Sequence, residues 1–343
     1  MHYIAIHLFD ALLAGETLRI LDCGASGGGE AARWSFLGRK AEIHAFEADA
    51  DECAKLQTAA DAAGANCRYH PLFLGRSEKN RTLNIGEHQF SSSFLEPNLP
   101  LLNRIKYPYE GQILRGGVSS RVVRTITVDT TSLDDWAASA GVNEVDFAKI
   151  DIEGLELEVM EASPRIVDSS LALYLDVVFN ECWFGTPRIG DYDKFLFPRG
   201  FTLWDIARIK RFGKYDSPVS IGDSALTRQG QAANGEALYI ADPIARNAET
   251  LTVTRILKLA AIAEVMGQLE YAFELLVFAR DRPADAAQRE AIARLIKDAT
   301  RYYSFQDDRR VQMIRQWRER IAASIPRPLL RMLRPLDRLL PFR

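Results

Sequence analysis

The sequence predicts a doubly wound α/β fold, with a mostly parallel, Rossmann-like sheet of about seven strands and a helical appendage after it. Three observations predict it. Short apolar runs alternate with helical segments between residues 18 and 243, as in parallel sheets whose strands are joined by helices. A glycine-rich turn directly follows the first of these runs. Between residues 250 and 322, glycine and proline are rare and apolar residues recur at the spacing of a helix.

The composition suits one large domain with an addition, since 47% of the 343 residues are hydrophobic and 26% are charged. A net charge of −3 argues against nucleic acid as a partner held by electrostatic attraction. We expect, in order, an N-terminal helix (1–17), an α/β domain (18–243) with an irregular insert (75–121), a helical appendage (244–323) and a basic amphipathic tail (324–343).

The expected strands are apolar or β-branched runs bounded by turn residues. In chain order they cover 19–23, 41–46, 66–74, 122–128, 145–152, 171–179, 201–209 and 237–241. The first is closed by Gly24, and the run at 171–179 is apolar nearly throughout, as in a strand buried on both faces. We expect an antiparallel strand at the edge of this sheet.

Helices are expected between the strands. They cover 30–37, 50–63, 133–139, 155–162 and 191–197. The segment 50–63 is rich in alanine and is followed by Gly64, which suits the C-terminus of a helix. Ser132 stands directly before a helical pattern, where a serine side chain caps the first turn.

The insert at 75–121 is too long and irregular for a plain connection. We expect a functional loop, a lid or an inserted hairpin. Its serine-rich stretch, Ser91 to Ser93 with Phe94, is a plausible contact for a substrate, because binding residues concentrate on such loops.

The C-terminal part ends in a strongly basic segment, with ten arginines and two acidic residues over 309–343. Leucines are interleaved with the arginines in the tail at 324–343. Such a segment can contact an anionic membrane peripherally, or it can pack on the appendage or form a homo-oligomer contact. No apolar run reaches the roughly 20 residues that span a bilayer. The four cysteines include no C-x-x-C pair, and the N-terminus lacks the basic region of a secretory signal, so we expect a cytoplasmic protein, with any membrane contact at the inner face.

The central feature for function is the segment ILDCGASGGGEAARW, in which Asp22 precedes a turn containing Gly24, Gly27, Gly28 and Gly29. Glycines let the backbone turn sharply and let a ligand approach the main chain. The helix that follows offers free N–H groups to an anionic group such as a carboxylate or phosphate.

Glu47 closes the second expected strand, 25 residues after Asp22. An acid at this place accepts hydrogen bonds from ribose hydroxyls. The dinucleotide pattern G-x-G-x-x-G fails here, because Ser26 occupies the position of its second glycine. The acid before the glycines is more typical of S-adenosylmethionine sites, so we expect that cofactor rather than NAD.

The chain resembles the FkbM-type methyltransferases through four ordered blocks. These are ILDCGASGG, HAFEADADECAKL, TVDTTSLDDW and VDFAKIDIEGLELEVMEA, of which the last is the most specific. The resemblance covers about 18–205, and the chain departs from the family pattern at Ser26, Ala48 and Ser163. It implies S-adenosylmethionine-dependent methylation, generally of a hydroxyl oxygen on a sugar or polyketide-like substrate. The residues predicted to bind the cofactor are Asp22, Gly24, Ala25, Ser26, Gly27, Glu47 and Ala48.

Asp151 and Glu153 follow the strand FAKIDI, at the sheet edge where ligands of open α/β sheets bind. Methylation of a hydroxyl needs a group that takes its proton, so either acid is a candidate catalytic base. A structural role for either acid, in holding loops or starting the next helix, is the alternative. Asn180 and Glu181 end the next strand, and with Asp151 they are weak candidates for holding a divalent metal.

Two further polar residues in this part of the sheet are expected to be mainly structural. Lys149 lies within an apolar strand and needs an acidic partner at the sheet end. His70 follows the third strand and could lie near the adenine, although a structural role is favoured.

The function predicted is therefore that of an S-adenosylmethionine-dependent O-methyltransferase acting on a sugar, glycan or other small acceptor. The alternatives are an NAD-dependent sugar-modifying enzyme and a catalytically silent scaffold.

Overall fold

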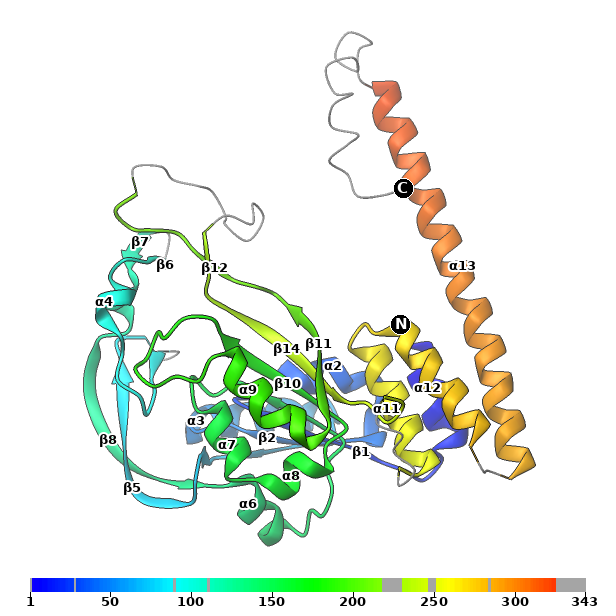
Figure 1. Ribbon diagram of the computed structural model, residues 1–343, viewed down its shortest axis with the longest axis horizontal. Coiled ribbons are helices and arrows are strands. Elements are labelled where there is room, and N and C mark those ends of the chain that lie inside the picture. The colour runs from blue at the N-terminus through cyan, green and yellow to red at the C-terminus, as the bar shows by residue number, and fades with distance from the viewer. Residues whose placement is uncertain are drawn as a thin grey trace.

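The computed structural model describes residues 2–27, 29–88, 91–109, 112–217, 230–245, 251–282 and 285–324. Its centre is a seven-stranded sheet in the order β11-β14-β10-β9-β1-β2-β3 (Figure 1). The bounds are β1 (Leu18–Cys23), β2 (Ala41–Phe46), β3 (Cys67–His70), β9 (Phe147–Ile150), β10 (Ala172–Val178), β11 (Phe201–Ala207) and β14 (Asn234–Ala241). Among these seven strands β14 alone runs in the direction opposite to the others. The predicted mostly parallel, seven-stranded α/β fold is confirmed.

The antiparallel strand does not lie at the edge, where we expected it. β14 pairs with β10 on one side and β11 on the other, so β11 forms the edge. Four consecutive residues of β14 are buried, from Ala237 to Ile240. A strand this apolar is stabilised by having neighbours on both sides.

The predicted strand at 122–128 does not belong to the main sheet. It is part of β8 (Val122–Thr131), which pairs antiparallel with β5 (Glu78–Gly86) and parallel with the short β4 (Phe73–Leu74). β4 is itself the end of the strand predicted at 66–74. Most of β8 is exposed, whereas the central parallel strands are buried. The β-branched run predicted a strand correctly. Polar and apolar residues alternate along it, however, and such a strand suits an antiparallel sheet with one face exposed to solvent.

The insert is thus an ordered β structure, which agrees with the inserted hairpin that was one of our three expectations. Its sheet continues beyond the predicted insert to Thr131. It also holds α4 (Leu99–Leu102), a hairpin of β6 (Lys106–Tyr109) and β7 (Gln112–Arg115), and α5 (Gly116–Ser119). A further short pair, β12 (Arg211–Phe212) with β13 (Gln231–Ala232), lies beyond β11. The ribbon of β5 and β8 stands at the opposite end of the molecule from the C-terminal helices (Figure 1).

Two apolar layers cover the two faces of the main sheet. One contains α6 (Leu133–Ala140), α7 (Glu156–Glu161), α8 (Pro164–Ser169) and α9 (Ile189–Leu196). The other contains α2 (Gly29–Trp34), the 3₁₀ helix η2 (Ser35–Lys40) and α3 (Ala50–Ala62). The predicted cap of α6 is present, since the Ser132 side chain accepts a hydrogen bond from the Asp135 N–H at 3.1 Å.

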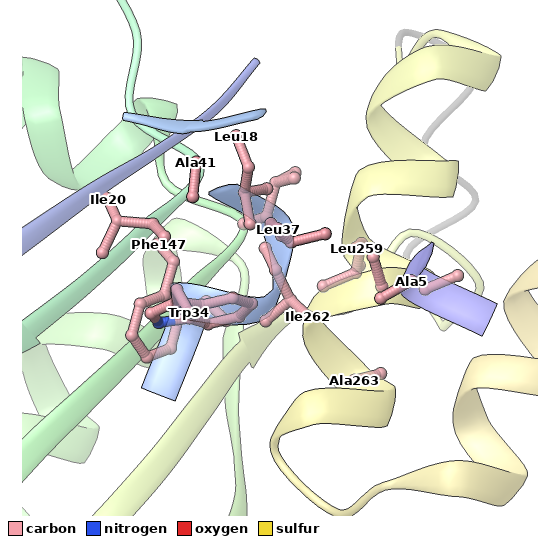
Figure 2. Packing of buried hydrophobic residues seen from close by; sticks show 14 of the residues in the cluster. Ala5, Leu18, Ile20, Trp34, Leu37, Ala41, Phe147, Leu259, Ile262 and Ala263 are labelled. Carbon is pink, nitrogen blue, oxygen red and sulfur yellow. The ribbon is translucent and has the colours of Figure 1, made fainter. Parts of the chain in front are cut away.

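The helical appendage completes the second layer instead of standing apart from the sheet. It consists of α11 (Val253–Val265), α12 (Leu269–Asp281) and α13 (Ala286–Ser324). Leu259 and Ile262 of α11 lie beside Trp34, Leu37 and the β1 residue Leu18 in one buried cluster (Figure 2). α2 is only six residues long, so it leaves sheet surface that α11 covers.

The N-terminal segment joins the same layer. It forms α1 (Tyr3–His7) and a π-helical turn, η1 (Leu8–Leu12). The buried carboxylate of Glu264 accepts hydrogen bonds from the Ile4 and Ala5 N–H groups at 2.7 and 2.8 Å. An acid at the N-terminus of a helix satisfies N–H groups that have no partner within the helix.

α13 packs against α12 and extends beyond the rest of the molecule (Figure 1). Within the described ranges, no helix combines the length and the apolar character needed to cross a bilayer. The predicted basic tail lies outside the described residues, apart from Ser324 at the end of α13, so its role stays a prediction.

Candidate active site

A cavity of about 750 Å³ opens at the carboxyl ends of β1, β2 and β9. Its floor comes from the turns that follow those strands, and its roof comes from the insert and β8. The residues that line it are Gly24, Ser26, Phe46, Glu47, Ala48, Asp49, Leu72, Phe73, Leu74, Leu83, Ile85, Gly86, Ser92, Ser93, Phe94, Arg124, Ile126, Lys149, Asp151, Ile152, Glu153 and Leu155. Ligands of open α/β sheets bind at this edge.

The turn after β1 is fixed by the end of β2. The N–H groups of Gly24 and Ala25 both donate to the Phe46 carbonyl oxygen, at 3.1 and 3.0 Å. Gly24 has φ +83°, and a Cβ atom built on it would lie 1.8 Å from the Asp151 carbonyl oxygen. Glycine is therefore required here for both conformation and space. Gly27 also has positive φ, but a Cβ there would meet nothing within 4 Å.

Three of the predicted cofactor residues support this turn without lining the cavity. Asp22 is 1% exposed, and its carboxylate accepts a hydrogen bond from the Glu30 N–H at 3.1 Å. It therefore holds the helix start against the strand end. Ala25 is buried, and Gly27 is exposed outside the lining. Gly28 lies outside the described residues.

Glu47 lies at the end of β2, and it lines the same cavity as Gly24 and Ser26. One carboxylate oxygen accepts a hydrogen bond from the Asp49 N–H at 2.9 Å. Partial burial raises the pKa of Glu47 above its ordinary value. Among the described residues no basic side chain forms an ion pair with it. An acid left without a cation at this place suits hydroxyl groups of a ligand.

Lys149 on β9 links the two acids on either side of it. Its ammonium lies 3.4 Å from the Asp22 carboxylate and 3.3 Å from the Asp151 carboxylate, and it donates to the Gly24 carbonyl oxygen at 3.1 Å. Burial works against the charged form, but the two carboxylates raise the pKa of Lys149 overall. The acidic partner expected for this lysine is therefore present. The side chain of Asp151 remains 41% exposed, toward the cavity that it lines.

Glu153 follows in a conformation that is uncommon for a residue with a side chain, with φ +58°. Its carbonyl oxygen accepts a hydrogen bond from the Ser93 hydroxyl at 2.8 Å. Burial raises the pKa of Glu153 well above its ordinary value, and the negative charges of Asp151 and Asp176 raise it further. Its carboxyl group thus favours the neutral form. Backbone strain of this kind concentrates at functional sites.

The sequence analysis missed two acids that complete this region. Glu156 is buried, and one carboxylate oxygen accepts hydrogen bonds from the Ile152 and Gly154 N–H groups at 2.9 and 3.1 Å. It therefore holds the strained turn in place. Asp176 on β10 has a pKa raised to about 7 by burial and by the charges of Asp151 and Glu156. The signal for Asp176 was an acid within the otherwise apolar run LYLDVVF.

The expectation that Asn180 and Glu181 join Asp151 at one rim is wrong. The Asn180 side chain is hydrogen-bonded to Ala232 and Gln231 of β13. The Glu181 carboxylate accepts the Gly185 N–H at 2.8 Å, within its own turn. Neither residue is among those that line the cavity. The described part of the chain contains no group of three acids, histidines or cysteines placed to hold a metal.

His70 takes the structural role that was favoured for it. Its Nε2 atom lies 3.1 Å from Nδ1 of His44, and its ring stacks on Phe46 and meets the edge of Trp136. Burial lowers the pKa of His70 to about 4, so the ring is neutral. It is not among the residues that line the cavity.

The serine-rich stretch of the insert does reach the site, as expected. Ser92, Ser93 and Phe94 line the cavity, and Ser93 is 3% exposed. Ser91 instead donates to the carbonyl oxygens of His88 and Ser119, both at 2.7 Å, inside the insert.

Comparison with known proteins agrees with the family that the sequence predicts. A model of the FkbM methyltransferase domain matches residues 22–203. The 2-O-methyltransferase NoeI of Sinorhizobium fredii (strain NBRC 101917 / NGR234) is 23% identical over 175 residues, which are 48% of this chain and 65% of that protein. The chain thus spans about two thirds of the length of this curated relative.

Solved structures of other methyltransferases show a weak likeness. Precorrin-6y C5,15-methyltransferase from Geobacter metallireducens has a TM-score of 0.33 and 13% identity, covering 69% of this chain and 86% of that one. TrmK of M. capricolum, solved with S-adenosylhomocysteine, has a TM-score of 0.34 and 6% identity, covering 83% and 91%. These scores are too low to support a functional conclusion. The family model, which matches more than half of the chain, does support one, and the protein belongs to the FkbM family of S-adenosylmethionine-dependent methyltransferases.

Proposed function

We propose that the protein methylates a hydroxyl oxygen of a sugar, glycan or other small acceptor, with Asp151 as the group that takes the hydroxyl proton. One observation carries this proposal. Asp151 and Glu153 line the same cavity as Gly24, Ser26 and Glu47, so the acids and the predicted cofactor residues face one space. The name of the relative NoeI, a 2-O-methyltransferase, supports oxygen as the methylated atom.

The residues of the β1 and β2 ends fit S-adenosylmethionine. Gly24 lines the cavity, and without a Cβ atom its turn lies directly against the Asp151 main chain at the end of β9. Glu47 offers a partly desolvated carboxylate to ribose hydroxyls, and Ala48 and Leu72 offer apolar contact beside it. When bound, S-adenosylmethionine supplies an electrophilic methyl group. Asp22 and Lys149 act as positioning residues for this turn.

The two acids differ in their surroundings. The Asp151 side chain pairs with the Lys149 ammonium 3.3 Å away, and it is exposed enough to reach a hydroxyl group. A carboxylate accepts a proton as the oxygen gains its methyl group. The pKa of Glu153 is raised well above its ordinary value by burial, so we assign this acid to hydrogen bonding with the acceptor and Asp151 to proton removal.

The test is transfer of isotope-labelled methyl from S-adenosylmethionine to a panel of glucose, glucuronate and glucose 6-phosphate, with the methylated atom located by NMR. We expect an O-methyl product. The Asp151→Asn variant should lose about 10²-fold or more in turnover and still bind S-adenosylhomocysteine. Asp129→Asn is the matched control, because Asp129 lies on the exposed side of β8 and pairs with Lys79 at 2.7 Å.

Three results would contradict the proposal. One is a product methylated on nitrogen, carbon or sulfur in place of oxygen. Another is an Asp151→Asn enzyme with the turnover of the Asp129→Asn control. The third is no transfer to any member of the panel by a protein that binds S-adenosylhomocysteine.

A further inference from the structure

The roof of the cavity is one face of the β5–β8 ribbon. In its antiparallel register Leu83 pairs with Ile126, and Ile85 pairs with Arg124. Side chains of directly paired residues lie on the same face of a sheet, and so do residues two apart in one strand. All four of these residues line the cavity. Arg124 is therefore on the inner face of the ribbon, and it is the one charged residue of β5 and β8 among those that line the cavity.

Two other cations near the cavity, Arg81 and Lys149, are already paired with acids. Arg81, on the same inner face, forms a two-pronged ion pair with Glu158, in which Nη2 and Oε2 are 2.9 Å apart. Lys149 is held between Asp22 and Asp151. Arg124 is exposed and makes no hydrogen bond or ion pair with any described residue. It is thus a guanidinium group that faces a ligand cavity with its five donors unused.

We propose that Arg124 binds an anionic group of the methyl acceptor, a carboxylate or a phosphate, so that the substrate is an acidic hydroxyl compound and not a neutral one. This inference rests on the proposed function, because it assigns the roof of the same cavity to the acceptor. The planar guanidinium group matches the two oxygens of a carboxylate or phosphate in a bidentate geometry.

The charge distribution of the cavity restricts such a group to the roof. The floor carries Glu47, Asp49 and Asp151, which disfavour an anion. An acceptor held by its anionic end at Arg124 is therefore oriented with its hydroxyl groups toward Asp151. The apolar side chains of Leu83, Ile85 and Ile126 line the cavity beside Arg124 on the same face of the ribbon.

The test measures acceptor binding by calorimetry, with protein saturated by S-adenosylhomocysteine so that no reaction is needed. The probes are glucuronate, glucose 6-phosphate and glucose. We expect wild-type protein to bind one of the two anions more tightly than glucose, and the better anion tells a carboxylate site from a phosphate site. Arg124→Gln should weaken that binding by about 10- to 100-fold. Arg124→Lys should weaken it by less, because lysine keeps the positive charge and loses only the bidentate geometry of the guanidinium group.

The matched control is Arg121→Gln. Arg121 is an exposed arginine just before β8, it pairs with Glu87 at 2.8 Å, and it does not line the cavity. This variant should bind all three probes as wild type does. The preference for the anion should also shrink as salt is raised.

The inference is wrong if glucose binds as tightly as both anions, or if Arg124→Gln and Arg121→Gln bind the anions equally. Its failure is distinct from failure of the proposed function. Equal methylation of neutral and acidic acceptors by wild type and Arg124→Gln overturns the role of Arg124 alone. Anion binding that depends on Arg124, without any transfer to oxygen, overturns O-methylation alone.

Discussion

The hydroxyl of Ser93 donates a hydrogen bond to the carbonyl oxygen of Glu153 at 2.8 Å, and it also accepts one from the Leu95 N–H at 3.2 Å. This contact ties the insert to the strained turn that follows β9. The insert supplies the roof of the cavity and the turn supplies acids of its floor, so this buried hydroxyl helps to set the distance between the two parts. The insert is therefore a fixed wall of the site at this point.

Ser93→Ala should lower turnover by about tenfold and leave the affinity for S-adenosylhomocysteine nearly unchanged. The Glu153 carbonyl oxygen then loses a buried partner, which costs about 1–3 kcal/mol. Steady-state methyl transfer and calorimetric titration measure the two quantities. Ser91→Ala is the control, because Ser91 also loses hydrogen bonds but only within the insert. Equal losses of turnover in the two variants would contradict a positioning role for Ser93.

Gly24→Ala should abolish binding of S-adenosylhomocysteine, whereas Gly27→Ala should bind it. Both glycines have positive φ, so both variants bear a conformational cost of about 1–2 kcal/mol. Only at Gly24 does the added Cβ collide with the Asp151 carbonyl oxygen, which forces the β1 turn and the β9 end apart. Calorimetric titration and thermal unfolding check this pair. If Gly24→Ala binds as well as Gly27→Ala, the two strand ends do not form one site.

Asp176→Asn should make the protein less sensitive to pH between about 4 and 7. The pKa of Asp176 is about 7, raised from 3.8, so the folded state keeps a proton that the unfolded chain releases at lower pH. The unfolded state then binds fewer protons, and wild-type stability falls as pH rises through this range. The amide of asparagine does not titrate in this range. Its oxygen can still accept the hydrogen bond that Asn234 donates to Asp176 in the wild type, at 3.0 Å.

Urea unfolding at pH 4, 6 and 8 measures this effect. We expect the free energy of unfolding of Asp176→Asn to be close to that of wild type at pH 4 and greater than it at pH 8. A difference that stays constant across the three pH values would show that Asp176 titrates as an ordinary exposed aspartate.

Leu259→Ala should lower the free energy of unfolding of the whole chain by about 2–5 kcal/mol, the usual cost of emptying a buried leucine site. Leu259 is 0% exposed and packs in the cluster that reaches Leu18 and Trp34 of the α/β domain (Figure 2). Val277→Ala on α12, which is 38% exposed, is the control and should change stability little. Chemical unfolding followed by tryptophan fluorescence reports on both. A separate, earlier transition for the appendage would contradict a shared core.

The sequence predicted the parts of this site that depend on neighbours along the chain. Gly24 follows an apolar run and Glu47 closes the next one, and adjacent parallel strands bring such ends together. The position of Lys149 within an apolar strand predicted an acidic partner, and in the structure it pairs with both Asp22 and Asp151.

What escaped prediction depends on partners far away in the sequence. Asn180 follows its strand at the expected edge, but its side chain is taken by Gln231 and Ala232, some 50 residues later. The β-branched run of β8 does not reveal whether it joins the main sheet or β5. The helical spacing around Leu259 predicts a helix, but nothing local shows that the short α2 leaves sheet surface for it to cover.

The central claim is that one cavity, between the Gly24 turn, Glu47 and Asp151, holds the methyl donor beside the acid that takes the proton. A crystal structure of the full chain soaked with S-adenosylhomocysteine tests it most directly. The account predicts density over the Gly24 turn, with the ribose hydroxyls on the Glu47 carboxylate and the sulfur on the side of Asp151. Density at another edge of the sheet, or a ribose without contact to Glu47, would contradict it.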